Sequence, residues 1–286
     1  MEQIKAKLIP DDMHIEKPKG FSLEQKFIDD FNAQEKKSDI YNCSKCKNKG
    51  LIAFLNEDGQ PTFKKCTCFN SRRNRQRLSD LGLLTFIDRT YANDDDSIQE
   101  DWLNFTKIKT KEFVRDFKNN KNYWLFVGGK IGSGKTSRCV FALAKMMKAK
   151  PELTIDYFNW DTRYKELIFD KDKDTIIENL KYADILYIDD FFRIRKTTEL
   201  TAMERDAAKM IIDYRYINQK ITLISSELFI SEITLLDEAI GSRIYQMTGK
   251  GKYNIEIKRD EAKNLRLLKG ESEWLAKKNT KIWKKK

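Results

Sequence analysis

From about residue 105 the chain alternates short apolar runs with helix-length stretches of mixed polarity. This alternation is typical of a parallel α/β sheet, in which a helix carries the chain back to the start of each next strand. The runs are nearly continuously apolar, as strands are when helices cover both faces of their sheet. We therefore expect strands at residues 123–128, 153–159, 184–189, 221–226 and 253–257.

The stretches between these runs have the spacing of amphipathic helices. The predicted helices start near Lys135, Asp161, Met203 and Ile233. The last of them should direct four residues toward the sheet, namely Ile233, Leu236, Ala239 and Ile240. Earlier in the chain, apolar positions from Phe21 to Phe31 approximate one helical face, and an arginine-rich helix follows from Arg72.

These patterns divide the chain into five parts. We expect a helical segment over residues 1–40, a cysteine module over 41–70 and a basic linker helix over 71–104. An α/β domain over 105–270 then precedes a basic tail over 271–286. A chain of 286 residues has room for one α/β core of ordinary size and a small accessory module.

Charge and hydropathy restrict the partners of the chain. The 55 Lys and Arg exceed the 44 Asp and Glu, so the formal net charge is +11. This sign suits a polyanion such as nucleic acid, although many basic proteins have no such partner. Apolar runs are too short to cross a bilayer, and the first residues lack the apolar centre of a signal peptide. We therefore expect a cytoplasmic protein without a membrane partner.

Residues 129–136 match the phosphate-loop pattern G-x-x-x-x-G-K-[ST] at every position. Glycines let backbone N–H groups point inward at phosphates, and the following helix directs the positive end of its dipole at the same anion. Lys135 should reach the β- and γ-phosphates of ATP, and the Thr136 hydroxyl should bind Mg²⁺. A glycine turn with an incidental lysine is the alternative, but the motif leaves a predicted strand and enters a predicted helix. The expected nucleotide-binding residues are Gly129, Lys130, Ile131, Gly132, Ser133, Gly134, Lys135, Thr136 and Ser137.

A pair of acids closes the third predicted strand. Four apolar residues, 185–188, are followed by Asp189 and Asp190. Asp189 should hold the Mg²⁺ shell, and Asp190 should orient or deprotonate the attacking water. Paired acids can also simply open a loop. The strand at 153–159 intervenes between the phosphate loop and the acids, unlike in simple nucleotide kinases, and favours ATP hydrolysis coupled to motion.

Four cysteines cluster in a short segment. Cys43 and Cys46 form one close pair and Cys66 and Cys68 another, with nineteen residues between the pairs. Two such pairs can complete a tetrahedral Zn²⁺ site that is structural, because no position stays open. The Asp58-Gly59 dipeptide between apolar runs predicts a hairpin, and hence a small zinc ribbon. A redox pair or unliganded thiols are the alternatives.

The order of these motifs resembles that of AAA+ ATPases. Within that class the chain resembles helicase loaders of the DnaC/DnaI type, especially phage versions, over roughly residues 40–270. The resemblance rests on the phosphate loop, the cysteine module and the segments 188–192, 214–216, 225–227 and 239–245.

The resemblance implies that Arg243 is an arginine finger, which reaches the γ-phosphate bound by a neighbouring subunit. Without the resemblance to this family, Arg243 would be interpreted as a surface arginine. A finger acting between subunits implies self-association into a ring or spiral on ATP binding. One position departs from the pattern: Glu227 stands where many AAA+ proteins carry an asparagine at the tip of the fourth strand. Its sensing role therefore stays open, with Ser226 or an outward-turned Glu227 as possibilities.

The resemblance further implies an ATP-dependent loader of the replicative hexameric helicase onto single-stranded DNA during replication initiation. The first seventy residues would bind the helicase. Residues 72–77 and the lysines of 277–286 are candidate contacts to the DNA backbone. A transposition helper ATPase is one alternative, which the cysteine module disfavours. A DNA-binding adaptor that uses ATP only as a switch is another, which the acidic pair disfavours and Glu227 supports.

Overall fold

The computed structural model describes residues 22–38, 42–86, 101–193, 200–260 and 263–265. The predicted tail at 271–286 and the stretch 87–100 of the predicted linker lie outside this part. The chain forms two compact units, Met1–Arg73 and Asn74–Lys286. No helix of the described residues is both long and apolar enough to span a bilayer.

Unit 1 (Met1–Arg73) consists of a helix and a hairpin. The elements are α1 (Leu23–Ala33), β1 (Leu51–Leu55) and β2 (Pro61–Lys65), followed by the start of α2 (Phe69–Asp80). The strands pair antiparallel, and the predicted turn lies at Gly59, whose φ of +73° favours glycine. The Asn32 amide attaches α1 to the hairpin, since it donates to the Ala53 carbonyl at 2.9 Å and accepts from the Ala53 N–H at 3.0 Å.

Unit 2 (Asn74–Lys286) is built on the predicted parallel sheet. Its strands are β3 (Leu125–Gly129), β4 (Ile155–Asn159), β5 (Ile185–Asp189), β6 (Ile221–Ser226) and β7 (Asn254–Ile257). All neighbours pair parallel, in the order β4-β5-β6-β3-β7. The central strands β3, β5 and β6 are buried throughout, whereas the edge strands are partly exposed. All five predicted strands are therefore confirmed.

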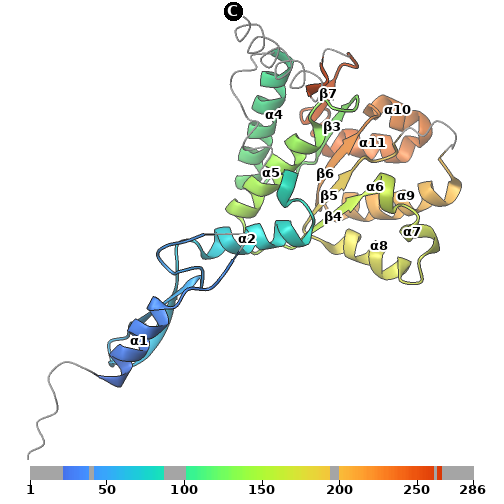
Figure 1. Ribbon diagram of the computed structural model, residues 1–286. Helices are drawn as coiled ribbons and strands as arrows, with labels where there is room; N and C mark the ends of the chain where they lie inside the picture. The colour runs from blue at the N-terminus through green and yellow to red at the C-terminus, as the bar shows by residue number, and fades with distance from the viewer. Residues whose placement is uncertain (1–21, 39–41, 87–100, 194–199, 261–262, 266–286) are drawn as a thin grey trace, which may run out of the picture. The chain divides into compact units, whose positions relative to one another are not determined.

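Helices cover both faces of the sheet, as Figure 1 shows. They are α4 (Asp101–Lys118), α5 (Lys135–Ala149), α6 (Trp160–Arg163), α7 (Glu166–Phe169), α8 (Lys173–Tyr182), α9 (Ala202–Ile217), α10 (Ile230–Leu236) and α11 (Glu238–Met247). One core cluster joins α4 and α5 to strand residues such as Val127 and Leu223. A second joins α8, α9 and α11 to the opposite strand face, at residues such as Phe126 and Ile224.

The helix boundaries correct two predictions. Instead of one helix from Asp161, the chain forms the three short helices α6, α7 and α8. The helix predicted near Ile233 is two helices, because the Asp237 side chain accepts from the Ile240 N–H at 2.9 Å and caps a new helix there. Ile233 and Ile240 are buried as predicted, but Leu236 is exposed, so its assignment to the sheet face was wrong.

In the sheet, β6 lies between β3, which leads into the phosphate loop, and β5, which ends in the acidic pair. The 153–159 run, which intervenes along the chain, forms β4 at the sheet edge instead. The phosphate loop and the acidic pair therefore face each other across the carboxyl end of β6.

Hydrogen bonds of a buried arginine connect the amino ends of β5 and β6. Arg215 of α9 is fully buried, and burial lowers the pKa of its guanidinium to about 9. Its Nε donates to the Thr222 hydroxyl at 2.9 Å. The other nitrogens donate to the carbonyls of Leu180, Lys181, Ala183 and Ile221. Within the segment 214–216, which carried part of the family resemblance, Arg215 is therefore a structural residue.

Candidate functional site

The phosphate loop connects β3 directly to α5. Gly129 is the last residue of β3, and Gly134 caps α5 in the left-handed region at φ +85°. Gly132 has φ +83°, and a Cβ there would collide with the Asn264 side chain. The glycines are thus required by the loop conformation. Lys135, Thr136 and Ser137 form the first turn of α5, whose N–H groups have no partners inside a helix and favour an anion.

Two side chains of the phosphate loop donate hydrogen bonds to a backbone carbonyl of the same loop. The Lys130 carbonyl accepts from the Lys135 ammonium at 3.1 Å and from the Ser133 hydroxyl at 2.8 Å. Lys135 and Ser133 are buried, whereas Ile131 at the loop tip is 42% exposed. The ammonium therefore lies within the loop, the place at which this motif binds phosphates.

The two predicted Mg²⁺ ligands lie in contact. The Thr136 hydroxyl donates to Asp189 Oδ1 at 3.2 Å, which joins the start of α5 to the end of β5. Asp189 is only 3% exposed. A hydroxyl and a carboxylate are hard oxygen donors, which Mg²⁺ prefers, so these side chains fit that ion.

Three further hydroxyls hold the Asp189 carboxylate. Tyr187 donates to Oδ1 at 2.7 Å, Ser225 donates to the same oxygen, and Tyr157 donates to Oδ2 at 3.4 Å. Sequence reasoning missed these roles. The signal for Tyr187 was its position two residues before Asp189, because alternate residues of a strand share a face. Tyr157 lies opposite Tyr187 in the β4–β5 register.

Asp190 begins the loop after β5 in a conformation that is uncommon for a residue with a side chain. Its φ is +51°, and its N–H donates to the Ser225 hydroxyl at 3.3 Å. Burial, and then the neighbouring Asp189 carboxylate, raises the pKa of Asp190 above its ordinary value, while Lys135 and Arg193 oppose the rise. Strained backbone and a perturbed pKa are both common at functional sites.

Ser225 and Ser226 end β6, the fourth strand of the sheet in chain order, and Glu227 follows them. Glu227 turns its carboxylate to Arg193, with Oε1 3.2 Å from the arginine Nε. The Ser226 hydroxyl donates to the Phe191 carbonyl at 2.6 Å and accepts from the Leu228 N–H at 3.0 Å. Ser225 is therefore the residue of this tip that touches the acidic pair.

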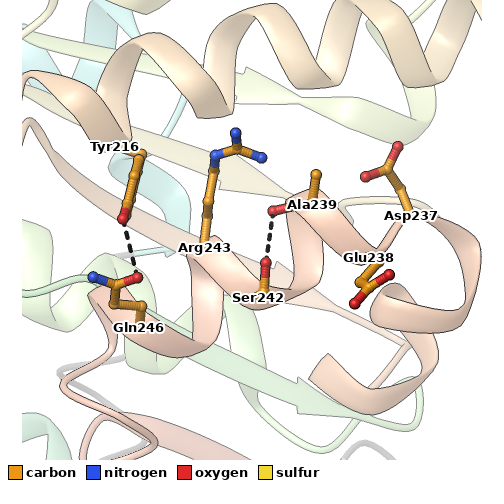
Figure 2. Close-up of a pocket in the computed structure, with 7 residues that line it drawn as sticks. All are labelled: Tyr216, Asp237, Glu238, Ala239, Ser242, Arg243 and Gln246. Carbon is orange, nitrogen blue, oxygen red and sulfur yellow. Dashed lines mark hydrogen bonds between the residues drawn. The ribbon is translucent and has the colours of Figure 1, made fainter.

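Arg243 lies on α11 beside α9. Its Nε is 3.2 Å from Asp213 Oδ1, and its guanidinium lies over the Tyr216 ring, 5.6 Å from the centroid. Figure 2 shows the guanidinium extending past Tyr216 at the rim of an open pocket. The other lining residues are Asp237, Glu238, Ala239, Ser242 and Gln246. The arginine is about one quarter exposed and so can be reached from outside the chain.

The four cysteines of unit 1 converge. Their sulfur atoms all lie within 4.8 Å of one another, with Cys43 and Cys66 4.0 Å apart and Cys46 and Cys68 3.4 Å apart. Four thiolates at about 2.3 Å from a tetrahedral Zn²⁺ lie about 3.8 Å apart, so the cluster fits the ion. The Gly50 N–H donates to Cys46 Sγ at 3.2 Å, as a bound thiolate requires of its surroundings.

The chain is similar in sequence to two proteins of Bacillus subtilis. No protein-family description matches it. The phage-like element PBSX protein XkdC of Bacillus subtilis (strain 168) is 27% identical over 221 residues, which cover 72% of this chain and 79% of that protein. The uncharacterized protein YqaM of the same strain is 27% identical over 190 residues, 64% of this chain and 60% of that protein.

Three solved structures with a similar fold are those of DnaI, the DnaC helicase loader and DnaA. The crystal structure of DnaI covers 58% of this chain and 87% of that chain, with 19% identity and a TM-score of 0.46. The DnaC helicase loader covers 56% and 92%, with 23% identity and a TM-score of 0.43. AMPPCP-bound DnaA from Aquifex aeolicus covers 56% and 49%, with 19% identity and a TM-score of 0.42.

The fold is the predicted AAA+ P-loop domain. The five parallel strands, the helices on both faces and the phosphate loop between β3 and α5 agree with this class. The solved structures of DnaI and the DnaC helicase loader are similar to the chain in fold.

Proposed function

We propose that the chain is an ATP-dependent loader, which places the replicative hexameric helicase on single-stranded DNA during replication initiation. The observation that carries this proposal is the contact of Thr136 with Asp189, behind a complete phosphate loop and beside Asp190. A site of this kind binds and hydrolyses a nucleoside triphosphate, and the similarity in fold to the loaders supports the use of that energy on a helicase.

The residues of the site divide the chemistry among them. Lys135 binds the β- and γ-phosphates of ATP, and Thr136 and Asp189 hold Mg²⁺. The ion supplies positive charge that offsets the charge of the phosphates. Asp190 accepts a proton from the attacking water or orients it, and Ser225 fixes both acids through its hydroxyl. Arg243 completes the site of a neighbouring subunit in a ring or spiral.

Binding of the partner helicase is the role that we propose for unit 1. Residues 41–70 form a ribbon on a structural Zn²⁺, and with α1 they bind the helicase. Single-stranded DNA contacts basic side chains through its phosphates. Of the basic α2 residues, Arg77 donates to the carbonyls of Pro151 and Leu153, so Arg72 and Arg73 are the better candidates for DNA.

The adaptor alternative loses its support from Glu227. That carboxylate is paired with Arg193 and stands beside an intact acidic pair, so its presence is compatible with hydrolysis. We therefore propose that the chain turns over ATP, rather than using ATP only as a switch.

The nucleotide site is tested by the Lys135→Ala variant. Loss of the ammonium should weaken the binding of a fluorescent ATP analogue at least about tenfold, because a charged hydrogen bond contributes about 1.5–3 kcal/mol. The exposed Lys209→Ala on α9 is the control and should bind as the native chain does. Equal affinity of the Lys135→Ala variant and the native chain would remove the phosphate loop from the site.

The zinc assignment is tested by metal analysis of the purified chain. We expect about one Zn²⁺ per chain, lost in Cys43→Ser, with unfolding of unit 1 because a structural ion contributes its binding energy to folding. Cys139, buried in α5, is the control, and Cys139→Ala should keep the ion. A native chain that is folded and free of metal would exclude the site.

A further inference from the structure

Three charged side chains meet beside the acidic pair, each from a different strand end. Arg193 follows β5, and its Nη1 lies 2.8 Å from Oδ2 of Asp161, which follows β4. Its Nε lies 3.2 Å from Oε1 of Glu227, which follows β6. The Glu227 side chain is only 14% exposed, so its charge is screened weakly by solvent.

Glu227 stands close to the phosphate loop. In the register of β3 and β6, Ser226 lies opposite Gly128, so Glu227 is next to the point where the loop begins. Electrostatic influence on Asp190 also comes from Lys135, Arg193 and Glu227, which places these charges around one site.

A carboxylate at this position opposes the binding of a nucleotide. ATP carries several negative charges, and the site already contains Asp189 and Asp190. Like charges repel one another most where solvent and salt screen them least, as at a side chain that is mostly buried. An uncompensated Glu227 would therefore weaken binding substantially, and a neutral side chain would avoid the cost.

The backbone around Glu227 is fixed as well. Arg259 donates to the Glu227 carbonyl at 2.7 Å and pairs its charge with Glu232. The Arg193 guanidinium, in contrast, pairs with the Glu227 carboxylate itself, as well as with that of Asp161. The attractions of Asp161, Glu227 and Asp190 raise the pKa of Arg193 against the opposing effect of burial.

We propose that Arg193 is a positioning residue of the nucleotide site, which neutralises Glu227 and holds its carboxylate away from the phosphates. The Arg193–Glu227 pair then takes the place of a single neutral side chain at the fourth-strand tip. This inference rests on the proposed nucleotide site, and it explains how a carboxylate is tolerated there.

A double-mutant cycle on ATP affinity tests the pair. The dissociation constant of a fluorescent ATP analogue is measured with Mg²⁺ for the native chain, Arg193→Gln, Glu227→Gln and the double variant. We expect Arg193→Gln to bind about tenfold more weakly, and the other two to stay within about threefold of the native chain. Restored affinity in the double variant is the distinctive result, because a purely structural loss would not be repaired by a second change.

Salt dependence and a conservative variant separate charge from packing. The deficit of Arg193→Gln should become smaller in about 0.5 M salt, because salt screens the exposed part of these charges and does not act on packing. Arg193→Lys keeps the charge and should bind within about threefold of the native chain, which tests the pair even when Arg193→Gln does not fold.

Several results would overturn the inference. They are unchanged affinity in Arg193→Gln, a double variant as weak as that single variant, a deficit that salt does not alter, or a tenfold loss in Arg193→Lys. A native chain that binds no nucleotide would instead overturn the proposed function, and the inference with it. The two failures are therefore distinguishable.

Discussion

Replacing Arg243 with alanine should lower ATP turnover about a thousandfold while ATP affinity stays within about threefold. The reason is that an arginine finger stabilises charge that develops in the transition state, an effect of about 10³ to 10⁵ in other systems. Turnover is measured by phosphate release at saturating ATP. Arg205→Ala, an exposed arginine on α9, is the matched control and should retain full turnover.

Mixing two inactive variants tests whether Arg243 acts between subunits. Arg243→Ala keeps its phosphate loop, and Lys135→Ala keeps its finger, so a mixed assembly contains some complete sites. We expect turnover of the mixture well above the sum of the separate variants. A mixture that is no more active than that sum would contradict action between subunits. Full turnover in Arg243→Ala alone would reduce Arg243 to a surface residue paired with Asp213.

Replacing Asp190 with asparagine should preserve ATP binding and lower turnover at least about a hundredfold. An amide cannot accept the proton of the attacking water, and general acid–base groups contribute about 10² to 10⁴ to rate. The strained backbone of Asp190 does not oppose the change, since asparagine tolerates the left-handed region. Single-turnover phosphate release separates the loss of chemistry from any change in ATP binding.

Asp184→Asn is the matched control for Asp190. It removes a carboxylate from the opposite end of the same strand, where Asp184 pairs with Lys220 at 3.0 Å. This variant should lose some stability but keep turnover, because Asp184 lies at the far edge of the sheet from the phosphate loop. An Asp190→Asn variant that still hydrolyses ATP at the native rate would remove Asp190 from its role.

Local sequence patterns predicted the parts of the molecule that depend on local chemistry. The central strands are buried throughout and mostly apolar, because helices cover both of their faces, so their runs stand out in the sequence. The phosphate loop is specified by glycines that its own backbone requires. Both motifs were placed at the carboxyl ends of strands of one parallel sheet, and the contact of Thr136 with Asp189 lies at that edge, across the end of β6.

Pairings between distant residues were not predictable in this way. Arg193 and Glu227 are separated by 34 positions, and no local pattern couples them. A charged residue inside a helix normally faces water, so the full burial of Arg215 has no signal in the sequence. The break between α10 and α11 did have a signal in the sequence, because aspartate is a common helix cap. The apolar spacing continues across Asp237, however, and therefore predicted a single helix.

We propose that ATP bound at this site drives the placement of a helicase on DNA. The test measures how much hexameric replicative helicase, from the cell that carries the gene, is retained on closed circular single-stranded DNA. We predict retention with the native chain and ATP, and little with Lys135→Ala or without ATP. Helicase that is retained equally with and without the native chain would contradict the account.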